Sequence, residues 1–256
     1  MRSMISALRY KVSDIVRDIR LATDYAKDYP AGDLAQLRAN ILKTRFDKPL
    51  TGIQGWLTPN ERKTLYALGR HLDGPFLEIG PWAGLSTSCI AYGIRDSQKK
   101  KFFLTVELNP SMEHFRPLGD EIGFFFPKDS AKPRAVADKA TFERDVVPVL
   151  ARKGRVLSLL QENLKRLQLR DFVEILAGDF TQAPNLGYKF IFCDATHGYD
   201  EIAINAPALR PYLSPGTVLA CHDITASDEK HLRSFLPLGY SFTVDSLFVG
   251  EVIGEA

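Results

Sequence analysis

The sequence predicts an α/β fold in which helices cover a mainly parallel sheet. From residue 76 onward, short apolar runs alternate with amphipathic helical stretches, an alternation typical of βαβ units. A glycine-rich turn follows the first of these runs, and acidic residues follow the later ones. Because ligands of such sheets bind beyond the carboxyl ends of the strands, we expect the function to reside in these turns.

The bulk composition excludes several classes of protein. The chain has 256 residues, of which 45% are hydrophobic and 25% charged, as in ordinary globular proteins. Its net charge of +2 gives no electrostatic footprint for nucleic acid, and no apolar run approaches the ~20 residues of a membrane helix. The N-terminus does not resemble a secretory signal, so we expect a cytoplasmic protein that binds neither nucleic acid nor membrane. Buried thiols in a reducing compartment are indicated for Cys89, Cys193 and Cys221.

An N-terminal helical extension is predicted for residues 1–74. Its first helix carries an apolar stripe at three- and four-residue steps, formed by Ile5, Leu8, Val12, Ile15 and Ile19. A second helix begins near Asp33, and a third begins at Thr58, where Pro59 and Glu61 complete a capping pattern. Because the stripe must be buried, we expect it to form a homo-oligomer such as a dimer, to cover the binding site, or to pack on the chain's own core.

Strands and helices alternate in residues 75–256. The predicted buried strands are residues 76–79, 102–108, 172–176, 190–193 and 217–221. The predicted helices between them are residues 85–94, 156–167 and 202–213, and an antiparallel pair is expected at 240–244 and 247–253. Residues 109–153 are long for a simple crossover, which indicates either a lid-like insertion or a helical excursion without function.

The turn after the first strand has the sequence FLEIGPWAGLSTS. Its glycines allow a ligand to approach the backbone, and the start of the following helix suits a carboxylate. A dinucleotide fingerprint would need glycine where Trp82 and Leu85 stand, so a pyrophosphate cradle is poorly supported. Glu107 ends the second strand 23 positions after Gly84, where an acid can accept hydrogen bonds from ribose hydroxyls. We therefore expect a nucleoside without pyrophosphate that is joined to an amino acid, whose ammonium group Glu78 can meet.

Polar residues also follow the later strands. Asp179 comes after the third strand and can bond an adenine amino group, with Phe180 beside the ring. Asp194 follows the next strand, and His222 and Asp223 follow the one after it. The alternative for Asp194, His222 and Asp223 is a capping or turn role. Their common position at strand ends favours a site.

The order of five motifs resembles class I S-adenosylmethionine-dependent methyltransferases. The motifs are LEIGPWAGLST, TVELNP, LAGDF, FIFCDATHGYDE and LSPGTVLACHDI, and the resemblance covers roughly residues 52–225. Within that family the chain is similar to the branch of macrocin-type O-methyltransferases and cephalosporin-hydroxylase-like proteins. The resemblance implies a Rossmann-like, mainly parallel seven-stranded sheet with helices on both faces and an antiparallel last strand.

The resemblance also implies an activity. It implies methyl transfer from S-adenosyl-L-methionine to a hydroxyl of a small-molecule acceptor, such as a sugar or a secondary metabolite. The expected cofactor pocket consists of Glu78, Gly80, Pro81, Trp82, Gly84, Ser86, Glu107, Asp179 and Phe180. Another nucleotide-dependent enzyme, such as a dehydrogenase, and a non-catalytic cofactor-binding relative remain as alternatives.

A divalent cation, Mg²⁺ or another, is expected at Asp194, His222 and Asp223, since relatives carry acidic metal ligands at the first and last of these positions. A cation would lower the pKa of the acceptor hydroxyl. Because magnesium prefers oxygen donors, His222 would bind through water or select another metal. His197 is the expected general base, because histidine titrates near neutral pH, and the alternative is a loop histidine bonded to the backbone. Asp194 and His222 are expected as further catalytic residues.

Overall fold

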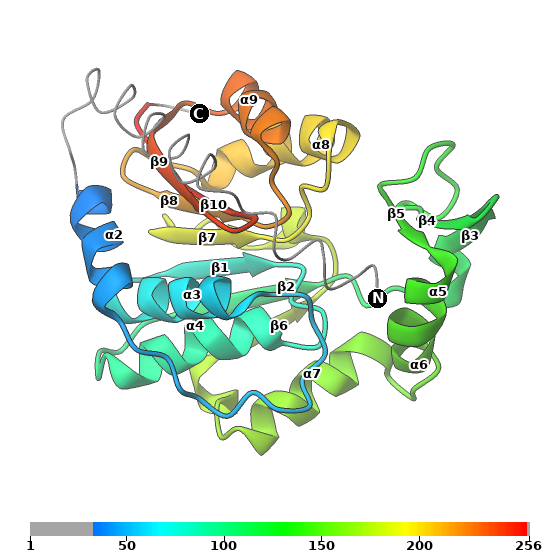
Figure 1. Cartoon of the computed structure of the whole chain (residues 1–256), viewed down its shortest axis with the longest axis horizontal. Coiled ribbons are helices and arrows are strands. Elements are labelled where there is room, and N and C mark those ends of the chain that lie inside the picture. Colours follow the sequence, from blue (N-terminus) through cyan, green and yellow to red (C-terminus); the bar gives the residue numbers. More distant parts are fainter. Residues whose placement is uncertain (1–32, 255–256) are drawn as a thin grey trace, which may run out of the picture.

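The structure is a computed structural model, and it describes residues 33–254 (Figure 1). Its centre is a seven-stranded sheet in the order β6-β2-β1-β7-β8-β10-β9, which confirms the predicted fold class. The strands are β1 (Phe76–Ile79), β2 (Phe103–Glu107), β6 (Glu174–Ala177), β7 (Phe190–Cys193), β8 (Val218–Cys221), β9 (Leu238–Val244) and β10 (Leu247–Val252). All neighbouring strands from β6 to β8 pair in parallel, whereas β10 is antiparallel to both β8 and β9.

Helices cover both faces of this sheet (Figure 1). One face packs against α2 (Asp33–Lys43), α3 (Pro59–His71), α4 (Leu85–Asp96) and α7 (Arg155–Arg166). The other packs against α8 (Tyr199–Leu209) and α9 (Ala226–Phe235). Strand β1 feeds both cores, because Phe76 and Leu77 are fully buried on opposite faces. Short helical turns complete the framework: η3 (Arg170–Phe172), η4 (Phe180–Gln182) and η5 (Arg210–Tyr212).

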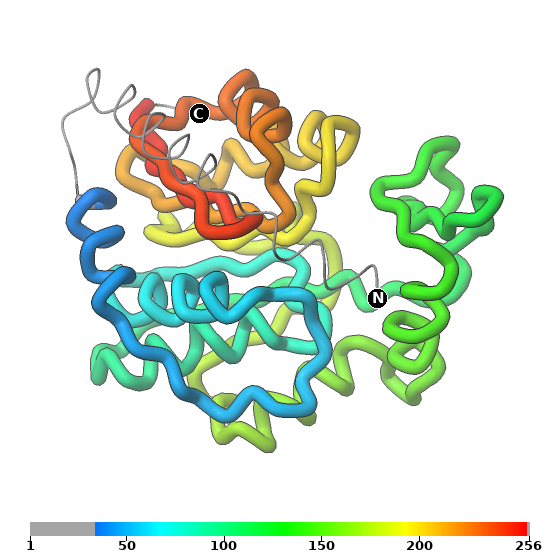
Figure 2. The backbone as a smooth tube through the Cα atoms, in the orientation of Figure 1, coloured from blue at the N-terminus to red at the C-terminus, as the bar shows by residue number. Residues whose placement is uncertain are grey.

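The capping pattern predicted at Thr58 is confirmed at the start of α3. The Thr58 side chain accepts a hydrogen bond from the Glu61 backbone, and Glu61 Oε2 accepts one from the Thr58 N–H at 2.7 Å. Figure 2 shows residues 44–58 running from α2 to this helix start. Residues 54–57 of this segment line the cavity described below. The hydrogen bonds that begin α3 at Thr58 therefore help to position one wall of that cavity.

The insertion forms a second, smaller body beside the carboxyl ends of the main strands (Figure 1). It contains a three-stranded antiparallel sheet, β3-β4-β5, followed by short helical segments. The elements are η1 (Met112–His114), β3 (Phe115–Leu118), β4 (Glu121–Phe124), β5 (Ala135–Asp138), α5 (Lys139–Thr141), the π-helical η2 (Phe142–Val146) and α6 (Val147–Leu150). We call residues 115–150 the cap. Its sheet was not predicted, because its four-residue strands carry little alternation of apolar and polar residues.

Three further expectations concern the N-terminal stripe, membrane helices and the cysteines. The apolar stripe of residues 5–19 lies outside the described residues, and the homo-oligomer that it was expected to form stays a prediction. Within residues 33–254, no helix is long and apolar enough to cross a membrane. The three cysteines are buried and free, as predicted.

Candidate active site

A cavity of about 310 Å³ lies between the carboxyl edge of the main sheet and the cap. The sheet side supplies the turns after β1, β2, β6, β7 and β8, and the cap supplies aromatic side chains. Of the expected cofactor residues, those that line it are Gly80, Pro81, Trp82, Ser86, Glu107, Asp179 and Phe180. Five separate strand ends therefore converge on one space, as the parallel topology requires.

The turn after β1 holds its backbone against the neighbouring strand end. Gly80 has φ +80°, and a Cβ there would lie 2.9 Å from the carbonyl oxygen of Asp194, so only glycine fits this turn without displacement. Trp82 also has a positive φ, of 48°, which is unusual for a large side chain. Its ring lies 6.1 Å from that of Trp56. Trp82 thus gives this turn an aromatic side chain in the cavity wall, at the position where a pyrophosphate cradle would need glycine.

Glu107 is a buried acid at the end of β2 that lines the cavity. Its Oε1 accepts the backbone N–H of Asn109 at 2.7 Å. Burial raises the pKa of Glu107 to about 7. A buried carboxylate favours donors that can hydrogen-bond to it, and vicinal hydroxyls of a ribose supply them.

Asp179 serves as a local cap as well as lining the cavity. Its Oδ1 accepts hydrogen bonds from the backbone N–H and the hydroxyl of Thr181, at 2.8 and 2.6 Å. One of its oxygens is therefore a local cap, a role that the sequence analysis did not assign to this acid. Phe180 follows it in the cavity wall.

Glu78 and Gly84 do not line the cavity, contrary to expectation. The Glu78 side chain is fully buried and accepts the Thr87 hydroxyl at 2.6 Å, so it points at α4 rather than toward a ligand. Gly84 has φ +90° at the start of α4, and a Cβ there would lie 2.6 Å from Leu160 of α7. Its role is helix packing, which the motif alone does not distinguish from ligand contact.

The buried carboxylate of Glu78 leads to a prediction about stability. Among the described residues its Oε1 has no hydrogen-bond partner, and burial raises the pKa of Glu78 to about 7 from an ordinary 4.5. The folded state therefore binds the proton more tightly, and this contribution to stability is complete below about pH 4.5 and is lost as pH rises through about 7. Glu78→Gln should remove a pH-dependent loss on the order of 2 kcal/mol between these limits. Urea unfolding at pH 5 and pH 8 measures it, with the exposed Glu174→Gln as the matched control; equal pH dependence in wild type and Glu78→Gln would contradict it.

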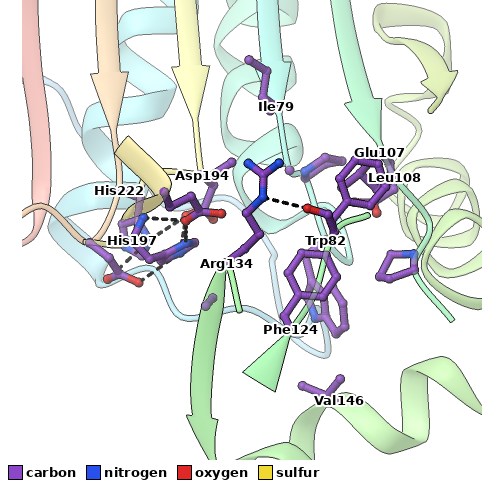
Figure 3. Close-up of a pocket in the computed structure, with 18 of the residues that line it drawn as sticks. Ile79, Trp82, Glu107, Leu108, Phe124, Arg134, Val146, Asp194, His197 and His222 are labelled. Carbon is purple, nitrogen blue, oxygen red and sulfur yellow. Dashed lines mark hydrogen bonds and ion pairs between the residues drawn. The ribbon is translucent and has the colours of Figure 1, made fainter. Parts of the chain in front are cut away.

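Four side chains that follow β7 and β8 line the cavity, and Figure 3 shows three of them, Asp194, His197 and His222, close together on one side. We call Asp194, His197, His222 and Asp223 the histidine cluster. His222 Nδ1 lies 3.2 Å from Asp194 Oδ1 and 3.6 Å from Asp223 Oδ1. His197 Nε2 lies 3.6 Å from Asp194 Oδ1 and 3.7 Å from Asp223 Oδ2. The structure thus brings together all the residues predicted to be catalytic or metal-binding.

Two glutamates that the sequence analysis did not assign to the site lie behind the histidines. Glu201 Oε2 lies 2.7 Å from His197 Nδ1 and also accepts the His197 backbone N–H at 2.7 Å. Glu61 Oε2 lies 3.4 Å from His222 Nε2. Glu201 is four residues after His197 at a helix start, a spacing that could have indicated it. Glu61 was recognised only as a helix cap, because its contact with His222 spans 161 positions of sequence that carry no local signal.

These charges set the protonation of the cluster. Burial opposes the charged imidazoles, but the carboxylates of Asp194 and Glu201 outweigh it and hold the pKa of His197 well above its usual range. In the same way, Asp194 and Glu61 raise the pKa of His222 to about 10 against burial. Burial acts to raise the pKa of Asp194, yet its two histidine partners hold it well below its usual range. The histidine cluster is therefore a set of paired opposite charges.

The predicted cation at Asp194, His222 and Asp223 receives no support from this arrangement. Within the part of the chain that the structure describes, no three His, Cys, Asp or Glu side chains are disposed to hold a metal ion. The imidazole nitrogens and carboxylate oxygens of the cluster lie against one another instead. In addition, His222 Nδ1, the atom nearest Asp194, is held between two acids.

The cap supplies cavity residues that the sequence analysis did not assign. They are Phe115, Ile122, Phe124, Phe126, Arg134, Ala135, Val136, Ala137, Phe142 and Val146. The expectation of a lid-like insertion located this region without identifying its side chains, because short irregular strands give no register from which to choose the inward face.

A protein-family model matches this chain. A model described as a methyltransferase domain matches residues 77–224, more than half of the 256-residue chain. No curated protein matches the sequence.

Solved structures with similar folds include an O-methyltransferase from Bacillus cereus in complex with SAH, at 16% identity, covering 98% of this chain and 96% of that one, with a TM-score of 0.47. The O-methyltransferase TomG from Streptomyces achromogenes, involved in tomaymycin synthesis and solved with SAM, is 14% identical, covering 98% and 95%, with a TM-score of 0.47. A cofactor-bound protein from MTB is 15% identical, covering 91% and 96%, with a TM-score of 0.49.

Proposed function

Because this chain belongs to the methyltransferase domain family, we propose that it transfers the methyl group of S-adenosylmethionine to a hydroxyl group of a small-molecule acceptor. One observation carries the proposal: a single cavity joins Gly80 and Glu107 on one side with His197 and Glu201 on the other. A nucleoside-bearing donor can thus bind beside Gly80 and Glu107. A hydroxylated acceptor can bind next to it, beside His197 as the base.

The chemistry of the sheet-side wall fits the donor. Glu107 offers a buried carboxylate for the ribose, Gly80 leaves backbone room, and Ser86 lies in the first turn of α4, whose N-terminus favours a carboxylate. Bound there, S-adenosylmethionine would supply a methyl group that is carried by a positively charged sulfur. Attack of an oxygen on the methyl carbon would break the carbon–sulfur bond and leave the sulfur as a neutral thioether.

The histidine cluster supplies the proton acceptor. With Nδ1 held by Glu201, His197 keeps Nε2 among Asp194 and Asp223, and all four side chains line the cavity. Because these carboxylates raise the pKa of His197, its neutral form is populated only at higher pH. In that form, Nε2 takes the proton of the acceptor hydroxyl as the new carbon–oxygen bond forms, and the carboxylates stabilise the resulting imidazolium. Glu201 fixes the ring orientation and is a positioning residue.

The test is transfer of a labelled methyl group. Purified enzyme incubated with methyl-labelled S-adenosylmethionine and a panel of hydroxylated metabolites, both sugars and aromatic compounds, should label at least one acceptor on oxygen. Mass spectrometry of the product locates the methyl group. Label found only on nitrogen or carbon would overturn the hydroxyl part of the proposal.

Removing divalent cations tests whether His197 is sufficient as the base. We expect turnover to persist in excess chelator, because the proposed proton transfer uses only His197 and Glu201. The measurement is the initial rate before and after chelation, followed by titration with Mg²⁺, Mn²⁺ and Zn²⁺. If chelation removed the activity and one of these ions restored it, and if Asp223→Asn prevented that restoration, this mechanism would be contradicted. A cation would then be placed at Asp194, His222 and Asp223.

A further inference from the structure

We propose that the acceptor is a hydroxylated aromatic anion and that Arg134 of the cap binds its carboxylate. This inference rests on the proposed function and names the substrate class for the same cavity. It depends on three features of the cavity: an apolar wall, one arginine held in place by hydrogen bonds, and a hydrogen-bonded connection between that arginine and the loop that carries the proposed base.

The wall opposite the sheet is almost entirely apolar. It is formed by Phe115, Ile122, Phe124, Phe126, Phe142 and Val146. Several of these rings pack on one another, with centroids 5.2 Å apart for Phe115 and Phe124 and 5.0 Å for Phe115 and Phe142. A sugar would place its hydroxyls against carbon here and lose their hydrogen bonds to water. A flat aromatic ring would instead bury apolar surface against phenylalanine.

Arg134 is the one lysine or arginine among the described residues that line this cavity. Its Nε donates to the Phe126 carbonyl at 2.9 Å, and its Nη1 donates to Asn205 Oδ1 at 3.1 Å. Within residues 33–254 the structure gives it no carboxylate partner. A half-buried guanidinium that is held in place by neutral acceptors favours an anionic ligand, because a planar carboxylate can take its remaining N–H groups.

The arginine has a fixed position relative to the histidine cluster. Asn205, which accepts from Arg134, also donates through Nδ2 to the Ala195 carbonyl at 2.6 Å. Ala195 follows Asp194 directly, so one side chain of α8 connects the guanidinium to the loop that carries His197. Figure 3 shows Arg134 between the histidine cluster and the rings of Trp82 and Phe124. An anionic group on Arg134 would thus hold a ring on the apolar wall with a hydroxyl toward His197.

A carboxylate in this cavity has two sources, the acceptor and the amino-acid end of the donor. We assign Arg134 to the acceptor, because its anchors lie on the cap and on α8, whereas the first turn of α4 lies on the donor side. Separate binding measurements for each source distinguish the two.

The experiment uses the full chain and matched probes. Calorimetry measures the binding of the three hydroxybenzoate isomers and of the corresponding uncharged hydroxybenzamides to the enzyme saturated with S-adenosylhomocysteine. At least one hydroxybenzoate should bind about 10-fold or more tightly than its amide, the scale of a hydrogen-bonded charge pair. Arg134→Gln should erase this preference, and Arg134→Lys should keep part of it.

A control variant and a separate measurement of S-adenosylhomocysteine affinity distinguish the possible outcomes. Arg116→Gln removes a cap arginine that stacks on Phe125 and does not line the cavity, and it should leave the preference unchanged. Circular dichroism confirms that each variant is folded. Equal binding of acids and amides by wild type would overturn the inference, as would a loss of S-adenosylhomocysteine affinity in Arg134→Gln, which would assign the arginine to the donor. Failure of wild type to bind S-adenosylhomocysteine at all would instead refute the proposed function.

Discussion

Replacing His197 with alanine should lower kcat by about 10²–10⁴-fold while leaving the affinity for S-adenosylhomocysteine nearly unchanged, because general-base catalysis contributes on this scale. His197 is the side chain whose one nitrogen is held by Glu201 and whose other nitrogen lies among the acids of the cavity. Steady-state rates with any labelled acceptor, together with calorimetry, separate the chemical step from donor binding. A His197→Ala enzyme with the wild-type kcat would eliminate this residue as the base.

Glu201→Gln provides the companion measurement, because it keeps the size of the side chain and removes its charge. The Glu201 carboxylate helps to raise the pKa of His197, so its loss should lower that pKa. The basic form of His197 would then be populated at lower pH, and the rising limb of the pH–rate profile should move toward acid relative to wild type. A lower rate with an unmoved profile would mean that Glu201 serves only the local fold.

Truncating Glu107 to alanine should weaken S-adenosylhomocysteine binding by about 1–3 kcal/mol, the usual loss for hydrogen bonds to a charged group. Its carboxylate lies buried at the end of β2 in the cavity wall. Since its pKa is raised to about 7, the ionised acceptor forms as pH rises through this value, and wild-type affinity should be higher at pH 8 than at pH 6.

The control for Glu107 is Glu113→Ala, which removes an exposed acid paired with Lys128 at the surface. Neither its affinity nor its pH dependence should differ from wild type. If Glu107→Ala bound S-adenosylhomocysteine as tightly as wild type, the ribose would have to lie elsewhere in the cavity.

The sequence predicts the main sheet well because local signals and topology agree there. The run at residues 76–79 is buried on both faces, as a parallel central strand requires, and the capping pattern at Thr58 sets the start of α3. Acids at strand ends could be placed near one another without knowing any distance, since parallel strands end at one edge. Asp194 and Asp223, which neighbour each other in the structure through the two histidines, illustrate this inference.

The parts that were missed depend on packing between distant segments. Glu78 sits in the same motif as Gly80, yet its alternation along β1 turns it into the core, where it meets Thr87. Helix α9 has only two large apolar residues, Leu232 and Phe235, so its period is weak in the sequence. The position of Arg134 depends on Phe126, in the loop after β4, and on Asn205 of α8, which no motif connects.

The central claim is that this cavity holds S-adenosylmethionine and not a dinucleotide. Calorimetry of the full chain with S-adenosylhomocysteine and, separately, with NAD tests it most directly. We expect one site per chain for S-adenosylhomocysteine and no heat of binding for NAD, because Trp82 and Leu85 occupy the positions where a pyrophosphate cradle needs glycine. Binding of NAD by a folded protein that does not bind S-adenosylhomocysteine would contradict it.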